Sequence, residues 1–352
     1  MTLLQTRGAG RVATPDRPRA TPQVSTARAR SAATLVLVAA LAVLLTALAS
    51  VLIGSRALPL AVLFDPEDPL RAIYQARVER TALAAAVGVA LGLAGALMQG
   101  LTRNPLADPG LLGVNAGASF AMVLAISVFG ISQLSGYVWF AFAGAAVAAV
   151  AVHGVAALGR GGATPVKLAV AGAAVTAAVS SWTAAVLLTD RATMETFRLW
   201  QVGTVGGRSV EVLATGLPFL LVGTVLALAG SRVLDALALG DDVARALGRR
   251  TTLDRLLVGV AIVLLAGTAT ALAGPIGFVG LVVPHAVRAV VGPGHARLLP
   301  LSAVAGAVLV MGADTVGRVV LPPAEVQVGI MTAVIGAPVF LLLVRRGRLG
   351  SL

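Results

Sequence analysis

Residues 81–99 read TALAAAVGVALGLAGALMQ, an apolar stretch without a charged side chain. A helix needs about 20 such residues to cross the hydrocarbon core of a bilayer, so the stretch predicts a membrane-spanning helix. Gly88, Gly92 and Ala96 recur at four-residue spacing and therefore share one face of that helix. Small residues in this pattern let two helices approach closely, and we expect this face to pack against another helix.

The whole chain shares this apolar character. Of its 352 residues, 58% are hydrophobic and only 12% are charged, against about 45–50% and 25% in typical soluble domains. This composition excludes a soluble enzyme, and it is the opposite of a disordered chain. The apolar stretches lack the two-residue alternation of a membrane barrel. We therefore predict an all-α, polytopic membrane protein. Because there is no cysteine, disulfides, zinc–thiolate sites and thiol nucleophiles are excluded.

Ten stretches qualify as spanning helices. The eighth is the shortest and is interrupted by Gly274-Pro275, Gly277 and Gly280, which predicts a broken helix that lies against protein or a water-filled cavity. The predicted organisation is a disordered basic cytoplasmic tail (1–32), a ten-helix transmembrane domain (33–346) and a short cytoplasmic C-terminal tail (347–352). The predicted spans are Ala33–Ile53, Thr81–Gln99, Leu111–Ile131, Val138–Leu158, Val166–Leu188, Val210–Gly230, Leu256–Gly274, Ile276–Val291, Leu299–Gly317 and Gln327–Val344.

The net charge of +12 is better explained by topology than by nucleic-acid binding. With the N-terminus inside and ten spans alternating, most of the 27 Lys and Arg residues fall on the cytoplasmic side, as the positive-inside rule requires. We therefore expect both termini in the cytoplasm of a bacterium and a location in its cytoplasmic membrane.

The sequence lacks the residues of a self-contained enzyme. It has no G-x-x-x-x-G-K-[ST] loop for ATP, and Lys167 is its only lysine. His285 and His295 bracket a predicted cytoplasmic loop without a carboxylate cluster, so we predict ordinary hydrogen bonding and no metal site. We expect no catalytic residue and no cofactor. Asp314 lies inside a predicted span four residues before Arg318, a spacing that predicts an ion pair.

Three segments between the spans are more specific. Residues 99–114 read QGLTRNPLADPGLLGV; they predict a tight turn in which Asp108-Pro109 caps the following helix. Residues 237–250 read LALGDDVARALGRR and predict a short helix in a cytoplasmic loop. Asp241 and Asp242 suit its N-terminus, and Gly248 its C-terminal end. Its apolar face (Leu239, Val243, Leu247) suits a groove of a partner protein. The third segment, GPIGFVGLVVPH, covers residues 274–285.

Together with residues 329–340, these segments resemble the FecCD-type permeases of ABC importers for iron chelates and cobalamin, and the resemblance spans about Ala33 to Arg346. It implies a type II importer permease with ten helices per subunit and two permease subunits, identical or related, around one path. It also implies two cytoplasmic ATPase subunits and an extracytoplasmic substrate-binding protein. Two positions depart from the family pattern, because Glu79 and Gln327 stand where proline is usual.

Two candidate contact sites follow from the resemblance. Arg77, Arg80 and Arg318 match family arginines that pair with glutamates of the binding protein; solvated surface arginines, and for Arg318 the pair with Asp314, are the competing interpretations. The ATPase-coupling candidates are the residues of the short cytoplasmic helix: Leu239, Gly240, Asp241, Asp242, Ala244, Arg245, Leu247 and Gly248.

We therefore expect the permease subunit of an ATP-driven importer for an iron(III)–siderophore complex. Cobalamin or haem import by the same architecture remains open. A secondary carrier or channel would need coupling ions or a gated pore of its own. A membrane enzyme is disfavoured by the missing catalytic residues.

Overall fold

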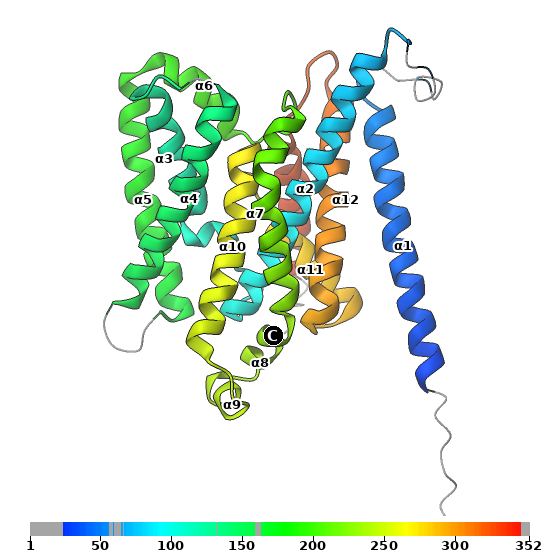
Figure 1. The fold of residues 1–352 in the computed structure, drawn as a ribbon, viewed down its shortest axis with the longest axis vertical. Helices are drawn as coiled ribbons and strands as arrows, with labels where there is room; N and C mark the ends of the chain where they lie inside the picture. The colour runs from blue at the N-terminus through cyan, green and yellow to red at the C-terminus, as the bar shows by residue number, and fades with distance from the viewer. Residues whose placement is uncertain are drawn as a thin grey trace, which may run out of the picture.

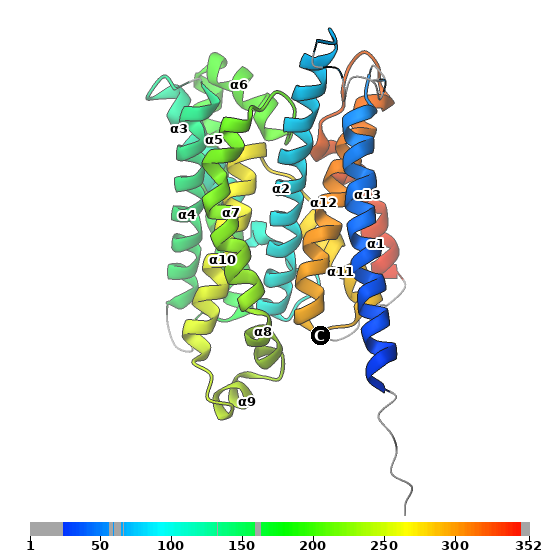
Figure 2. The same cartoon turned by 45° about the vertical axis from the view of Figure 1, so that its right-hand side comes forward.

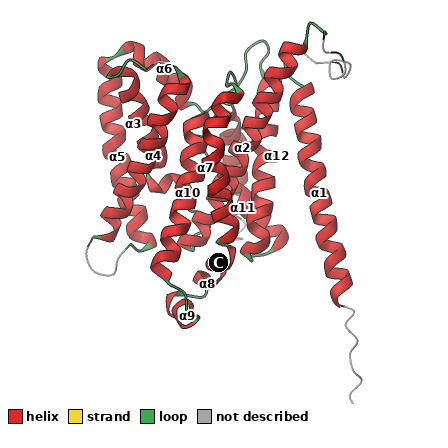
Figure 3. Ribbon diagram, viewed as in Figure 1, coloured by secondary structure: helices red, strands yellow, loops and turns green. Residues whose placement is uncertain are grey.

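The computed structural model describes residues 24–55, 59, 65, 67–131, 133–158 and 163–345. The described part is built from helices, with no strand (Figure 3). Seven helices are long and apolar enough to span a membrane, and three shorter apolar helices (α3, α11 and α13) accompany them. These ten correspond to the ten predicted spans. The helices are α1 (Val24–Leu52), α2 (Arg71–Thr102), α3 (Val114–Ser127), α4 (Leu134–Ala157), α5 (Pro165–Thr189), α6 (Arg191–Gln201), α7 (Val210–Ala229), α8 (Ser231–Ala238), α9 (Asp241–Ala246), α10 (Thr251–Ala273), α11 (Val279–Val291), α12 (His295–Val320) and α13 (Val328–Arg345).

The helices form one bundle with two distinct ends (Figures 1 and 2). The short helix α6 lies at one end, together with the start of α2 and the end of α12, and we call this the α6 end. The short helices α8 and α9 lie at the other, the α9 end. Helices α2 and α10 are the most buried of the long helices, whereas α1 stands at the edge, and only Ser50 is fully buried among its residues 33–52. The core therefore surrounds α2 and α10.

Helix α2 is central because glycines bring its backbone against α12. A methyl group added at Gly88 would overlap the Gly306 carbonyl of α12, and one added at Gly92 would overlap the Ser302 carbonyl. The small-residue face predicted from the four-residue spacing is thus a helix crossing, and side chains larger than hydrogen are excluded from it.

Several boundaries differ from prediction. Helix α1 begins at Val24, inside the stretch expected to be a disordered tail; residues 1–23 and 347–352 lie outside the described residues. Helix α2 begins at Arg71, so Arg77 and Arg80 lie within it and do not precede it. The polar first turns of α2 are stabilised by contacts with α1 and α12, which the hydropathy of α2 alone does not indicate.

Two predicted local features are confirmed with a change of detail. The Asp108 carboxylate accepts a hydrogen bond from the Gly110 N–H, and Pro109 opens a single 3-10 turn, Pro109–Leu112. The α-helix itself starts only at Val114, because Gly113 adopts φ 72° and interrupts the helical path. The predicted interruption of the eighth span is present only at its start, since residues 274–278 separate α10 from α11, and α11 then runs continuously through Gly280.

Candidate functional site

At the α6 end, a buried cluster of charged side chains joins α1, α2 and α12. Arg80 of α2 donates through Nε and Nη2 to the Asp314 carboxylate of α12, at distances from 2.8 to 3.0 Å. Its Nη1 donates to Glu325, in the loop before α13, at 2.7 Å. Arg80 therefore connects a fully buried carboxylate with a partly exposed one.

Arg318 lies deeper in the same cluster, with 1% of its surface exposed. Its Nη2 lies 3.3 Å from Asp314 Oδ2, which confirms the ion pair predicted from the i,i+4 spacing. The same nitrogen donates to the Ser50 hydroxyl of α1 at 2.9 Å. Arg77 is also buried, and its Nη1 donates to the carbonyls of Val51 and Leu52 at the C-terminal end of α1.

Arg77 and Arg318 are therefore not solvated surface arginines, which was one of the interpretations left open by the sequence. Their guanidinium groups are enclosed and bonded within this chain. Because Asp314 approaches two arginines at once, it stabilises a cluster that is otherwise positive. Arg80 alone combines partial exposure with a solvent-exposed partner, Glu325.

At the α9 end, α8 and α9 form a short elbow that projects from the bundle (Figure 1). The turn between them is made by Leu239 and Gly240, and Gly240 adopts φ 106°, a conformation that favours glycine. The expected single helix over 239–248 is therefore shorter. Asp241 and Asp242 do occupy the first turn of α9, and Gly248, at φ 79°, does end it.

The elbow presents an apolar face and is anchored by ion pairs. Leu239 and Leu247 are each 62% exposed, and Val243 is also exposed, while Ala244 is buried. Asp241 accepts a hydrogen bond from Arg103, at the end of α2, at 2.6 Å, and another from Arg255 of α10 at 2.7 Å. On the surface, Arg245 pairs with Asp242 at 3.0 Å. Sequence analysis missed the anchoring role of Asp241, because both arginines are distant in the chain.

A polar junction ties the elbow to the bundle. Asp235 of α8 accepts hydrogen bonds from the backbone N–H of His295, at 3.0 Å, and it lies 2.7 Å from His295 Nδ1. Nearby, the Gln99 amide donates to the carbonyls of Gly280 and Leu281, and Gln99 Oε1 accepts from Arg288 at 3.1 Å. His295 thus makes hydrogen bonds, as predicted. The feature of the sequence that could have indicated this junction is Gln99, a polar residue at the end of an otherwise apolar stretch.

Among the described residues, no group of three or more metal-ligating side chains comes together. Two acidic groups in the connecting segments have shifted pKa values. Burial raises the pKa of the Asp108 carboxyl, against the opposing hydrogen bond from Gly110. Hydrogen bonds from the side chain and backbone of Thr193 lower the pKa of Asp190, which caps α6. Both carboxyls are therefore used in capping turns.

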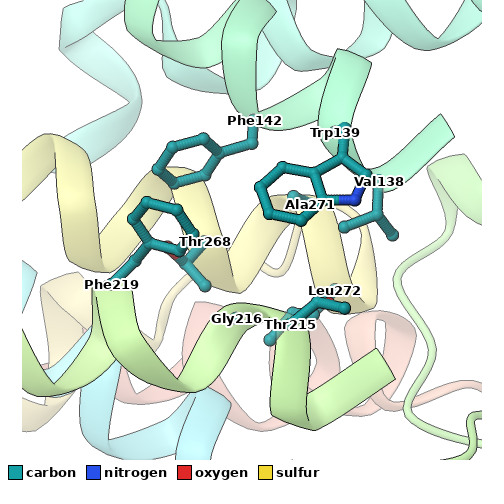
Figure 4. A pocket seen from close by; sticks show the side chains of 9 residues that line it. All are labelled: Val138, Trp139, Phe142, Thr215, Gly216, Phe219, Thr268, Ala271 and Leu272. Atoms are coloured by element: carbon teal, nitrogen blue, oxygen red, sulfur yellow. The ribbon is translucent and has the colours of Figure 1, made fainter. Parts of the chain in front are cut away.

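Two cavities stand out. The first lies between α4, α7 and α10, where Trp139, Phe142 and Phe219 surround it (Figure 4). Its volume of about 10 Å³ is that of about one water molecule, and the ring centroids of Phe142 and Phe219 lie 4.4 Å apart with their planes tilted by 41°. We interpret it as a packing gap. The second is larger, lies near α6, and is lined by both polar and apolar side chains.

Comparison with known proteins gives consistent matches. The profile of the FecCD transport family matches residues 36–346. The ferric enterobactin transport system permease protein FepD of Escherichia coli is 43% identical over 88% of this chain and 94% of its own length. The cobalamin import system permease protein BtuC of Halobacterium salinarum is 40% identical over 80% of this chain and 75% of its own. A solved ABC transporter in an inward-facing conformation has 29% identity and a TM-score of 0.79, covering 89% of this chain and 99% of that one.

Proposed function

This chain belongs to the FecCD transport family, and on that basis we propose that it is the permease subunit of an ABC importer for an iron(III)–siderophore complex. The observation that carries the proposal is the match over residues 36–346, nearly the whole helical bundle. It is supported by the similarity to permeases named for ferric enterobactin and Fe(3+)-citrate. The chain lacks an ATP-binding loop, so ATP hydrolysis falls to a partner.

The partners proposed are those of the family: two cytoplasmic ATPase subunits, an extracytoplasmic substrate-binding protein and a second permease copy or a related permease. The complex sits in the cytoplasmic membrane, with the α9 end and both termini in the cytoplasm. The α6 end then faces outward, toward the binding protein.

The decisive experiment compares substrates in a strain from which the gene has been deleted. We expect loss of uptake of labelled ferric siderophores, restored by the gene in trans, with unchanged uptake of labelled cobalamin. Because one of the relatives is a cobalamin permease, the opposite pattern would assign this chain to cobalamin. Uptake by the purified chain without an ATPase would indicate a secondary carrier.

Orientation gives a separate prediction. The excess of Arg in the segments on the α9 side supports a cytoplasmic location of that side. A reporter fused after Leu352 should therefore be active only in its cytoplasmic form. Activity of a periplasmic reporter at the same position would contradict the ten-helix topology or its direction.

The elbow at the α9 end is proposed as the ATPase-docking element. Leu239, Val243 and Leu247 of the elbow are exposed, without apolar cover from the described residues, and Asp241 fixes the position of the elbow against α2 and α10. An element held in this way can transmit a displacement of the ATPase to the bundle. The proposed coupling residues are the set that the sequence indicates: Leu239, Gly240, Asp241, Asp242, Ala244, Arg245, Leu247 and Gly248.

Charge introduced into this face should separate the subunits. Burying one leucine contributes roughly 1.5–3 kcal/mol, so the Leu239→Asp/Leu247→Asp variant should no longer co-purify with the ATPase, while its amount in the membrane stays unchanged. Leu321→Asp is the matched control, because Leu321 is 60% exposed at the opposite end. Parental co-purification of the double variant would show that the elbow is not the docking element.

For the binding protein, we propose docking through Arg80, with Glu325 as the competing internal carboxylate. A partner carboxylate can replace Glu325 on Arg80 Nη1 without disturbing the three hydrogen bonds from Arg80 Nε and Nη2 to Asp314. The guanidinium groups of Arg77 and Arg318 are enclosed. These two residues therefore support the Arg80 site indirectly, as members of the same buried cluster.

The two substitutions at this pair should have opposite effects. Arg80→Gln should weaken the affinity for the binding protein, and Glu325→Gln should strengthen it, each by up to about fivefold, because exposed ion pairs contribute about 0–1 kcal/mol. The affinities of the parent and of the two variants should converge as the salt concentration rises, because salt screens the ion pair. Arg245→Gln, at the α9 end, is the control. A Glu325→Gln variant that binds no more tightly than the parent would exclude the exchange.

A further inference from the structure

The larger cavity lies at the α6 end, between the start of α4, helix α6, the loop after α6 and the residue that precedes α13. Its volume is about 530 Å³, within the range of about 300–1,000 Å³ typical of small-molecule sites. The side chains that give it polar character are Tyr137, Glu195, Thr204, Arg208 and Gln327, with Trp200 in the wall.

The base of this cavity is fixed by close backbone contacts. The Thr204 N–H donates to the Ala273 carbonyl at the end of α10, at 2.7 Å, and the Gly329 N–H of α13 donates to the Gly203 carbonyl at 3.1 Å. A methyl group at Gly274 would overlap the Trp200 carbonyl. Helices α10 and α13 therefore hold the loop after α6 in place, and the cavity is preorganised.

Arg208 is the unusual residue of the cavity. Its Nη1 lies 3.4 Å from the Tyr137 hydroxyl, a neutral group, and no carboxylate pairs with it among the described residues. Its Nε is enclosed without a hydrogen-bond acceptor in the same part of the chain. Arg80, Arg103 and Arg255 each reach a carboxylate. Arg288 bonds the Gln99 amide oxygen and no carboxylate among the described residues, but it does not line this cavity. A partly buried cation without a bonded carboxylate, beside a cavity that holds further polar side chains, indicates that an anion completes it.

The remaining groups agree with an oxygen-rich ligand. Tyr137 is buried and its hydroxyl can donate, while the Thr204 hydroxyl accepts from the Gly206 N–H at 3.1 Å and keeps its own proton for donation. The opposing charge, Glu195, lies on the exposed rim of α6. Electrostatic interactions are stronger at the less hydrated Arg208 than at the rim, so the cavity as a whole favours a negative ligand.

We propose that this cavity is a binding site for the anionic oxygen face of a ferric chelate, with Arg208 as the charge partner and Tyr137, Thr204 and Gln327 as hydrogen-bond partners. This proposal rests on the proposed function and names a contact site for its substrate within a single chain. Glu195, on the rim, weakens the binding of anions and thereby limits retention of the ligand.

The test uses tryptophan fluorescence of the full chain purified in detergent. The chain has three tryptophans, so Trp139→Phe/Trp182→Phe leaves Trp200, in the cavity wall, as the sole reporter. Ferric citrate and ferric enterobactin, both anions, are the probes, with cyanocobalamin as the uncharged comparison. We expect saturable quenching by at least one ferric anion, and none with iron-free citrate.

Substitutions then locate the site. In this background, Arg208→Gln should raise Kd about tenfold or more, because a charge-assisted hydrogen bond is lost, and Tyr137→Phe should raise it severalfold. Glu195→Gln should lower Kd about two- to threefold. Arg198→Gln is the matched control, since Arg198 is an exposed arginine of α6, the helix that carries Glu195, and it does not line the cavity. Because Glu195 is exposed, its variant keeps the test decisive even where Arg208→Gln does not fold.

The outcomes separate this site from the proposed function. Unsaturable quenching by both ferric anions, or a Kd that none of the three cavity substitutions changes, overturns the site even where the deletion strain shows that the gene imports ferric siderophores. Tighter binding of cyanocobalamin than of either anion also overturns it. Saturable, Arg208-dependent binding supports the site whether or not the uptake experiment supports ferric siderophore import.

Discussion

Replacing Asp314 by asparagine is expected to destabilise the chain by about 3–5 kcal/mol, the usual effect of removing one partner from a buried ion pair. The Asp314 carboxylate is 1% exposed and accepts hydrogen bonds from Nε and Nη2 of Arg80. It also forms an ion pair with Arg318. Asparagine keeps the shape but removes the charge, so the enclosed guanidinium of Arg318 would lie beside Arg77 and Arg80 with only Glu325 for compensation.

The effect is measured as the midpoint of thermal unfolding in detergent and as the amount of folded protein in the membrane. Glu325→Gln is the control, because its carboxylate is 39% exposed and its removal should change stability by less than about 1 kcal/mol. A second substitution, Arg318→Gln, should restore part of the stability of Asp314→Asn, since it removes the uncompensated charge. An Asp314→Asn variant as stable as the parent would show that the cluster does not hold α1, α2 and α12 together.

Only part of this cluster could be predicted from the sequence. The Asp314–Arg318 pair follows from helical periodicity, because the residues are four apart on one helix. The pairing of Arg80 with Asp314 joins residues 234 positions apart, and no local rule connects them. The start of α2 at Arg71 was missed for the same reason, since its polar first turns are stabilised by other helices. Burial of Arg77 and Arg318 is thus a tertiary property.

The elbow, too, could be predicted only in part from the sequence. Asp241 at the start of α9 and Gly248 at its end were predicted, because capping depends on a few adjacent residues. The turn at Gly240 was missed, since the flanking residues are good helix formers and only the φ of 106° reveals the bend. The cavity near α6 could not be predicted at all, because its lining comes from four separate segments of the chain.

The second large effect is expected at the crossing of α2 and α12. Gly306→Ala should destabilise the chain by about 1–3 kcal/mol, because the added methyl group would overlap the Gly88 carbonyl, a backbone atom that cannot move aside. Gly306→Leu should abolish the folded state, since it forces apart two helices that pack backbone to backbone. Thermal unfolding in detergent and the yield of monodisperse protein measure both changes.

Gly312 provides the control within the same helix. No atom lies within 4 Å of a methyl group added there, so Gly312→Ala should be neutral or stabilise the chain by up to about 1 kcal/mol, because alanine favours the helix more than glycine does. Both substitutions replace glycine by alanine in α12, and they differ only in the atoms that surround the added methyl group. Equal unfolding midpoints for Gly306→Ala and Gly312→Ala would show that α2 and α12 are not in backbone contact. The central position of α2, on which the charged cluster at the α6 end also depends, would then have to be explained by side-chain packing alone.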